Sequence, residues 1–356
     1  MATVSSAERT TGWKTVAPDD EGWLELIARS PDALPFHRPE WLRVLEESYR
    51  FRPFVFGVTD GSGALEAGLP FLEVEDHFRG RRWIALPFTD RCPPLASSSG
   101  ARERLAAGLD EARRAAGARR LQIRSMVVGP RLAHGVTAVT HVLELGAGYE
   151  ALERSFSSAT RRNLRKAQRE GLEVRVADAE DDVVRVFYEL HARTRRRVGV
   201  PVQPRRFFRA LWQHGLARGL GQTLLVLHRG RPVAAGIFLE CGGNVVYKYG
   251  ASDERCWNLR PNNVLLAEAI RGACEQGGDV FDFGRSDLDD SGLRAFKASW
   301  GALEQPLVYS STGRESATPR ASAPVSAAAR VGSAIIRRLP VWFGRAVGAA
   351  IYRYAA

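Results

Sequence analysis

The stretch QTLLVLHRGRPVAAGIFLECGGNVVYKYGAS, residues 222–252, reads as three strands joined by two glycine-containing turns. The stretch FVFGVTDGSGALEAGLPFLEV, residues 54–74, followed by RRWIALP at 81–87, has the same order of strands and turns. Both second strands carry an Ala-Gly pair, Ala67-Gly68 and Ala235-Gly236, with Leu-Glu a few residues later. A period of roughly 170 residues is too long for a solenoid and therefore indicates a duplicated domain. The interface between two such copies is a favoured place for a ligand.

The composition describes a basic globular protein of 356 residues, long enough for two domains. Its 51 Lys and Arg exceed its 40 Asp and Glu, giving a net charge of +11. This excess indicates an anionic partner such as RNA, a phosphorylated lipid or a phosphate-bearing cofactor. The alternative is that an Arg- and Ala-rich composition serves only solubility or reflects codon usage.

The cysteines and the apolar segments bear on compartment. The four cysteines show no CxxC spacing, so we expect a reducing compartment, no disulfide framework and no metal site. The first residues, MATVSSAERTTGWK, contain no apolar run, and no stretch of 18 apolar residues follows. We therefore expect no signal peptide, no transmembrane segment and a cytoplasmic protein.

Helical and strand patterns alternate along the chain, which predicts an α/β or α+β fold with mixed sheets. The periodicity predicts helices near 39–49, 100–116, 149–171, 181–197, 205–216 and 261–276. We expect five segments: a flexible N-terminus (1–20), a first domain (21–148), a second domain carrying the reactive site (149–310), a Ser/Ala/Pro-rich linker (311–329) and a basic amphipathic tail (330–356).

The tail has apolar residues, including Trp342, on one helical face and arginines on the other, with a kink at Pro340. Such a segment can make a peripheral contact with the inner face of a membrane. The alternative is a C-terminal helix that packs on its parent domain.

Five runs carry a family resemblance: ATRRNLRKAQREGLEV (159–174), RRRVGVP (195–201), YKYGAS (247–252), LRPNNVLLAEAI (259–270) and FDFGRSDLDDSGLRAFKASWGA (281–302). Together they resemble the FemAB-like branch of the GNAT acyltransferase superfamily over roughly 35–310. The resemblance implies tandem GNAT-like domains, each a mixed sheet flanked by helices. It also implies a bacterial N-acyltransferase that moves an aminoacyl or acyl group to an amine of a cell-envelope or polysaccharide-related acceptor. Peptidoglycan aminoacyltransferases, which use aminoacyl-tRNA, belong to this branch.

The donor is left open between aminoacyl-tRNA and acyl-CoA, with no bound cofactor. Acetyl-CoA enzymes of the superfamily hold the pyrophosphate on a glycine-rich turn at a helix start, whereas ERCWNLRPNNVLL (254–266) has no glycine. We therefore expect no tight acetyl-CoA binding. Asn262 and Asn263 are expected to cap or line this helix start and to contact substrate. An acetyl/acyl-CoA-dependent GNAT N-acetyltransferase and a non-catalytic membrane- or RNA-binding protein with a degenerate GNAT fold are the alternatives.

Candidate reactive groups lie at 247–249 and 282–297, and for the pair at 296–297 the family resemblance gives the role. The pair Phe296-Lys297 is implied to line the transfer site, with the lysine stabilising the oxyanion. Tyr247 and Tyr249 are expected on one face of a strand, where a hydroxyl lines the acyl pocket; core aromatics are the alternative. Further candidate substrate contacts are Asp282 and Arg285, which could instead pair with each other.

Two groups of cations complete the candidates. Arg197 opens R-V-G-V-P, an element that in the resembling family lies beside the acceptor cleft, although cations at a helix C-terminus also complement its dipole. One helix face gathers five cations that could hold phosphates of tRNA or of a nucleotide- or lipid-linked substrate, unless it is merely solvated. These are Arg161, Arg162, Arg165, Lys166 and Arg169.

Overall fold

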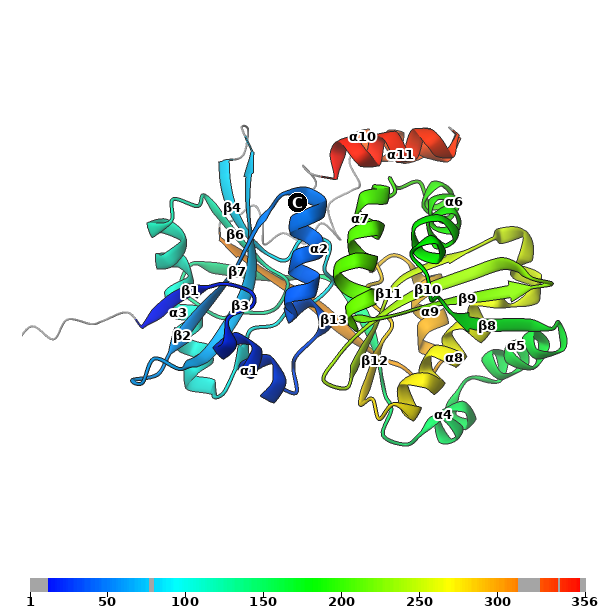
Figure 1. The fold of residues 1–356 in the computed structure, drawn as a ribbon, viewed down its shortest axis with the longest axis horizontal. Helices are drawn as coiled ribbons and strands as arrows, with labels where there is room; N and C mark the ends of the chain where they lie inside the picture. Colours follow the sequence, from blue (N-terminus) through cyan, green and yellow to red (C-terminus); the bar gives the residue numbers. More distant parts are fainter. Residues whose placement is uncertain (1–11, 77–79, 313–326, 339, 353–356) are drawn as a thin grey trace, which may run out of the picture.

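The strands form one mixed sheet that runs through the whole molecule (Figure 1). The computed structural model describes residues 12–76, 80–312, 327–338 and 340–352. Across these residues the sheet order is β1-β2-β3-β4-β6-β13-β7-β12-β11-β10-β9-β8, and β5 pairs with β3. The strands are β1 (Trp13–Val16), β2 (Arg52–Thr59), β3 (Leu65–Asp76), β4 (Gly80–Ala85), β5 (Leu95–Ala96), β6 (Arg120–Ile123), β7 (Leu132–Glu144), β8 (Leu172–Val176), β9 (Gly221–His228), β10 (Arg231–Cys241), β11 (Asn244–Ser252), β12 (Val280–Asp282) and β13 (Leu303–Thr312).

The helices lie against this sheet and over the junction of its two halves. They are α1 (Glu21–Arg29), η1 (Pro35–His37), α2 (Pro39–Tyr49), α3 (Ser99–Ala115), α4 (Tyr149–Ser155), α5 (Ser158–Arg169), η2 (Asp182–Phe187), α6 (Tyr188–Val198), α7 (Arg205–Ala210), η3 (Leu211–Gly215), η4 (Leu216–Arg218), η5 (Glu254–Leu259), α8 (Pro261–Glu275), α9 (Ser291–Ala298), α10 (Ala327–Arg338) and α11 (Val341–Ile351). The α/β class predicted from the alternating patterns is confirmed, and each of the helical regions predicted from periodicity is largely helical.

The duplicated order of strands predicted from the sequence is present in the structure. In the first half β2, β3 and β4 are followed by α3 and by β6, which pairs in parallel with β4. In the second half β9, β10 and β11 are followed by α8 and by β12, which pairs in parallel with β11. The repeated glycines make room for aromatic rings, because a Cβ at Gly68 would lie 2.7 Å from the Trp23 ring and one at Gly236 would lie 2.9 Å from Phe238.

Each half lends its last strand to the other. β7, from the first half, pairs with β12, and β13, from the second half, pairs with β6. The two strands also pair with each other along their length. The helices α2 and α7 meet over this junction, where Trp41 and Phe207 form an edge-to-face ring pair at 6.2 Å. The interface between the halves is therefore built on a continuous sheet and a shared aromatic core.

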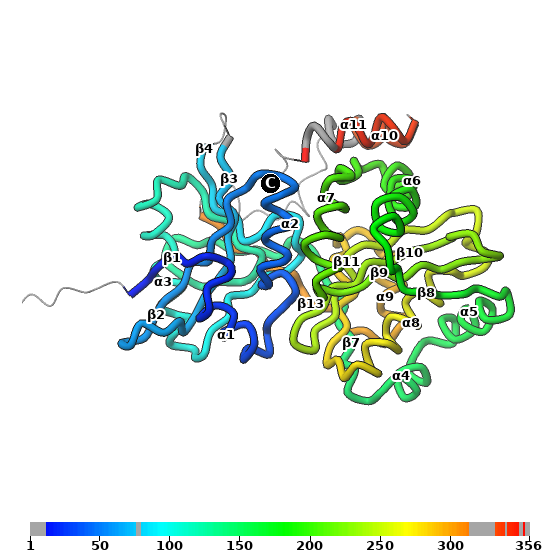
Figure 2. The backbone as a smooth tube through the Cα atoms, in the orientation of Figure 1, coloured from blue at the N-terminus to red at the C-terminus, as the bar shows by residue number. Residues whose placement is uncertain are grey.

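The tail packs mainly on α6 of the second half, as the second of its two interpretations predicted. It forms α10 and α11 on either side of Pro340, and Figure 2 shows both helices lying over α6 and α7. Most of the expected linker lies outside the described residues; its first two residues belong to β13 and its last three to α10. No helix within the described ranges is long and apolar enough to cross a membrane.

Candidate functional site

The strands β11 and β12 separate at the centre of the second half, and the separation opens a polar site. Their parallel pairing ends at Val246 and Asp282. Beyond it the chain turns at Gly284, whose φ of +72° is a left-handed conformation that glycine adopts without strain. A Cβ there would lie 3.0 Å from the Tyr247 carbonyl oxygen, so a larger residue would push the two segments apart.

Lys297 belongs to the short helix α9, which places its side chain over the point where β11 and β12 separate. The side chain is 4% exposed, and its ammonium donates to the carbonyl oxygens of Gly284 at 2.6 Å and of Arg285 at 3.1 Å. An ammonium has three N–H donors, so one remains for a substrate oxygen. Burial lowers the pKa of Lys297 to about 8, against the opposing pull of nearby carboxylates. The side chain is therefore mostly charged at pH 7.

Asp282 and Arg285 do not pair with each other. The Asp282 carboxylate accepts hydrogen bonds from the hydroxyl of Thr140 and from the backbone N–H of Gly284, at 2.8 Å in the latter case. Arg285 donates instead to Asp287 at 2.8 Å and to the carbonyl of Thr137 at 3.3 Å. Asp282 thus holds the turn that orients the carbonyl partners of Lys297, while the Arg285 side chain is engaged elsewhere.

The first half contributes charged groups that the sequence interpretation missed. A loop after β4 brings Asp90 within 3.4 Å of the Lys248 ammonium and Arg91 within 3.8 Å of Asp282. The Lys248 side chain is 4% exposed and its ammonium lies 5.2 Å from the centre of the Phe36 ring. The Tyr309 hydroxyl donates to the Asp90 carbonyl at 2.7 Å. The clue in the sequence was the Asp-Arg pair in the Pro-rich run PFTDRCPP, directly after a strand.

Tyr247 and Tyr249 lie on opposite faces of the sheet, so the expectation that they share one face is wrong. The pairing register shifts at Lys248: Tyr247 pairs with Phe238 and Tyr249 with Ile237. Such a β-bulge inserts one extra residue and turns the side chains beyond it to the other face. The bulge also carries Lys248 into the site between the halves.

The two tyrosines therefore meet different surroundings. Tyr247 stacks on Phe238 at 5.1 Å, and its hydroxyl lies where a Cβ of residue 250 would be. Tyr249 packs in the aromatic cluster of Phe207 and Phe208. Burial raises the pKa of both phenols, so both stay neutral. Phe296 packs on Trp300 at 6.3 Å and so fixes α9 next to the site.

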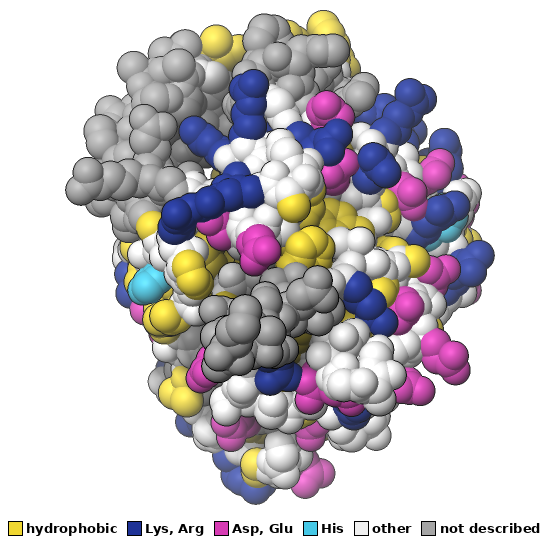
Figure 3. All heavy atoms as spheres, turned by 90° about the vertical axis from the view of Figure 1, so that its left-hand side faces the viewer, with side chains coloured by type: hydrophobic (Ala, Val, Ile, Leu, Met, Phe, Trp, Pro, Cys, Tyr) yellow, Lys and Arg dark blue, Asp and Glu magenta, His cyan; other side chains and the backbone are white. Residues whose placement is uncertain are grey.

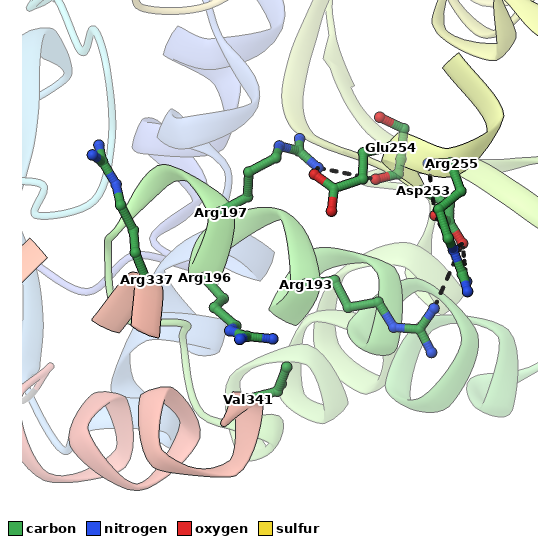
Figure 4. A pocket seen from close by; sticks show the side chains of 9 residues that line it. Arg193, Arg196, Arg197, Asp253, Glu254, Arg255, Arg337 and Val341 are labelled. Carbon is green, nitrogen blue, oxygen red and sulfur yellow. Dashed lines mark hydrogen bonds and ion pairs between the residues drawn. The ribbon is translucent and has the colours of Figure 1, made fainter. Parts of the chain in front are cut away.

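An arginine-rich cavity lies further along β11, at its carboxyl end (Figure 4). It measures about 550 Å³ and is bounded by α6, η5 and the tail. Five arginines face two carboxylates around it: Arg193, Arg196, Arg197, Arg255 and Arg337 against Asp253 and Glu254. Ser252 also lines it, four residues beyond Lys248, which at about 3.3 Å per strand residue is about 13 Å along β11 from Lys248. We call it the arginine cavity.

Arg197 and Arg196 behave differently in the arginine cavity. The guanidinium of Arg197 lies 4.6 Å from the centre of the Trp257 ring and 3.9 Å from Glu254. Arg196 points from α6 towards the tail (Figure 4) and has no ion-pair or side-chain hydrogen-bond partner within the described residues. An unpaired guanidinium in a cavity is available to an anionic ligand.

The start of α8 offers few free backbone donors. Pro261 has no N–H, and the Asn263 N–H already donates to the Arg260 carbonyl at 3.0 Å. Asn262 lies at the cavity side and donates to the Ser252 hydroxyl at 3.3 Å, whereas Asn263 is 5% exposed. The expected glycine-free helix start is thus also poor in N–H groups for a pyrophosphate.

The basic face of α5 is open to solvent at three of its five cations. Arg161 is held by the carbonyls of Arg154 and Phe156, and Lys166 lies 4.0 Å from Glu170. The other three cations of α5 are exposed and have no ion-pair partner in the described part of the chain: Arg162, Arg165 and Arg169. The face of the first half seen in Figure 3 instead intersperses basic and acidic side chains. Within the described residues no group of three or more His, Cys, Asp or Glu side chains could hold a metal ion.

Comparison with known proteins identifies the fold. Residues 154–297 match the family described as acetyltransferase (GNAT) domain. The crystal structure of FemX superposes with a TM-score of 0.68 at 15% identity, over 84% of this chain and 96% of that chain. The C-terminal domain of a putative lysylphosphatidylglycerol synthetase from Agrobacterium fabrum gives 0.54 at 14% identity, over 83% and 92%.

A tandem GNAT protein from the clavulanic acid biosynthesis pathway gives a TM-score of 0.51 at 14% identity, over 85% of this chain and 98% of that chain. A comparison with curated proteins finds no match. The chain therefore has the tandem fold of these structures, and its residues 154–297 match the GNAT acetyltransferase domain, in keeping with the resemblance that the sequence motifs carry.

Proposed function

We propose that this acyltransferase moves an aminoacyl group from aminoacyl-tRNA to an amine of a cell-envelope or polysaccharide-related acceptor, at the separation of β11 and β12. The observation that carries the proposal is the buried ammonium of Lys297, which keeps one N–H donor free over the strand ends. Two ion pairs between the halves, Lys248–Asp90 and Arg91–Asp282, lie nearby, and their carboxylates favour the charged form of Lys297. A buried positive group is suited to the negative charge that develops on a carbonyl oxygen.

The reaction divides between Lys297 and Asp90. The acceptor amine attacks the carbonyl carbon of the donor ester, and Lys297 stabilises the oxyanion of the tetrahedral intermediate. The carbon–oxygen bond to the tRNA then breaks, and the tRNA leaves with a free hydroxyl that takes its proton from Asp90. Asp90 has first accepted this proton from the attacking amine; its Oδ2 lies 3.6 Å from the Cβ position of Gly284, the residue whose carbonyl oxygen accepts from Lys297.

Three features support aminoacyl-tRNA as the donor. The start of α8 lacks the glycines and free N–H groups that hold a CoA pyrophosphate. The exposed cations Arg162, Arg165 and Arg169 on α5 offer an open surface to a polynucleotide backbone. The helix α5 begins beside the transfer site, since the Ser157 N–H donates to the Ser299 carbonyl at 2.9 Å, two residues beyond Lys297.

The name lysylphosphatidylglycerol synthetase, borne by one fold neighbour, describes an aminoacyl product and is in keeping with this donor. The arginine cavity, with an excess of three positive charges, would hold a phosphate group of the acceptor. Arg197 would contribute to that site, about 13 Å along β11 from Lys248.

The second candidate is an acyl-CoA-dependent N-acyltransferase, favoured by the GNAT domain match itself. Thermal-shift measurements with aminoacyl-tRNA, uncharged tRNA and acetyl-CoA separate the candidates. We expect stabilisation by aminoacyl-tRNA at micromolar concentrations and none by acetyl-CoA. Stabilisation by acetyl-CoA alone would reject the tRNA donor in favour of acyl-CoA. A protein that binds tRNA but transfers no labelled amino acid to any amine would be a binding protein.

A further inference from the structure

The tail contacts both halves of the molecule through Tyr352, which directly follows α11. The Tyr352 ring is 8% exposed and stacks 6.4 Å from the Tyr49 ring of the first half. Its hydroxyl accepts a hydrogen bond from Arg195 at 3.1 Å and donates to the Pro201 carbonyl at 3.2 Å, both in the second half. Docking of the tail therefore depends on how the two halves are placed and on the position of the end of α6.

A single glycine allows α11 to approach the core. A Cβ at Gly348 would lie 1.8 Å from the backbone oxygen of Val202, a distance that no side chain can occupy. Gly344, one helical turn earlier, has no atom within 4 Å of its Cβ position. The two glycines thus form a matched pair, in which only Gly348 is needed for docking.

The docked tail adds a positive charge to the arginine cavity. Arg337 of α10 donates to the Val198 carbonyl at 3.2 Å, in the last turn of α6. It lines the same cavity as Arg193, Arg196 and Arg197. Like charges gathered in one cavity repel, and Arg196 has no compensating partner among the described residues. An anion in the cavity would remove this repulsion and would gain Arg337 as a further contact.

We propose that the arginine cavity is a composite anion site, completed by the C-terminal tail, in which anion binding and tail docking strengthen each other. The inference rests on the anion-binding role given to the cavity in the proposed function. The ligand is a compact anion with at least two negative charges, because the cavity is concave and its excess is three positive charges. The two equilibria are linked. If the bound anion raises the equilibrium constant for tail docking by some factor, undocking of the tail must lower the affinity for the anion by the same factor.

The test uses inorganic pyrophosphate as the probe and the glycine pair as the perturbation. Calorimetry measures pyrophosphate binding to the full chain, to Gly348→Ala and to Gly344→Ala, and hydrogen exchange of 341–351 reports docking. Alanine favours a helix more than glycine does, so Gly344→Ala should leave both measurements unchanged. Gly348→Ala should speed hydrogen exchange in α11. It should also lower the affinity for pyrophosphate about fivefold or more, which is a typical coupling between two sites. If exchange shows a docked tail, the bulkier Gly348→Val replaces it.

Two further variants separate the coupling from the site itself. Arg337→Gln removes the tail's charge from the cavity together with its bond to the Val198 carbonyl. It should weaken pyrophosphate binding, and α11 should then exchange at the same rate with and without pyrophosphate, whereas in the wild type pyrophosphate slows that exchange. Arg196→Gln should weaken pyrophosphate while the tail stays docked. Equal affinity with docked and undocked tails would overturn the coupling and leave the anion site standing. Absence of binding to the wild type, or binding that ignores Arg196→Gln, would overturn the anion site itself, and the acyl-transfer proposal would stand on Lys297 alone.

Discussion

Replacing Lys297 by methionine isolates its charge from its bulk. Methionine keeps an unbranched stem of similar length and removes the ammonium that contacts the carbonyls of Gly284 and Arg285. Losing one stabiliser of an oxyanion typically lowers turnover by about 10²–10³. We therefore expect Lys297→Met to lose most of its activity.

The structure indicates that the variant will still fold. The pKa of Lys297 falls from an ordinary 10.5 to about 8, so burial disfavours its charged form by about 3 kcal/mol. Methionine removes this cost but leaves two carbonyl oxygens without their donor, at about 1–3 kcal/mol each. The two effects on the free energy of unfolding nearly cancel, or they leave the variant slightly less stable than the wild type. The melting temperature should therefore fall by no more than about 4 °C.

The assay follows transfer of a radiolabelled amino acid from aminoacyl-tRNA to an amine acceptor, alongside thermal melting and tRNA binding. Lys297→Met should bind tRNA as the wild type does and turn over at least a hundredfold more slowly. A matched control is Arg294→Met on the same helix, whose guanidinium pairs with the exposed Glu304. A Lys297→Met enzyme within about threefold of the wild-type rate would refute the role given to this lysine.

Three further predictions concern pH, the donor and the basic helix. Because Lys297 must be charged to meet an oxyanion and its pKa is about 8, turnover should fall as pH rises through 8; a rate that rises there would indicate a general base instead. Calorimetry should detect no tight acetyl-CoA binding at the glycine-free segment 254–263, and a low-micromolar dissociation constant would favour the acyl-CoA alternative. Changing Arg162, Arg165 and Arg169 together to Gln should weaken tRNA binding and reduce its salt dependence by up to three phosphate contacts, whereas unchanged binding would make α5 a merely solvated face.

The repeat and the helices could be predicted because local patterns determine them. Alternating apolar strands with glycine turns fixed the two strand sets, and the start of α8 was marked by Pro261. The exchange of β7 and β13 between the halves could not be predicted, since it depends on pairings between strands far apart in the chain. No local pattern distinguishes a strand that stays in its own half from one that crosses.

The site was only partly predictable for the same reason. Lys297, Asp282 and Arg285 stand close together in sequence and were found from one motif. Asp90 and Lys248 were missed, because their contact joins positions in different halves and depends on the bulge in β11. A strand pattern with period two assigns Lys248 to one face, and a single extra residue changes that assignment.

The most direct measurement of the central claim is whether the wild-type protein transfers a labelled amino acid from aminoacyl-tRNA to an amine. Mass spectrometry of a panel of amine-bearing sugars, lipids and peptides, incubated with charged tRNA and protein, identifies the product. We predict an amide-linked aminoacyl product that forms with the wild type and falls at least a hundredfold with Lys297→Met. Equal product from the two proteins, or product formed only when acetyl-CoA replaces the charged tRNA, would contradict the account.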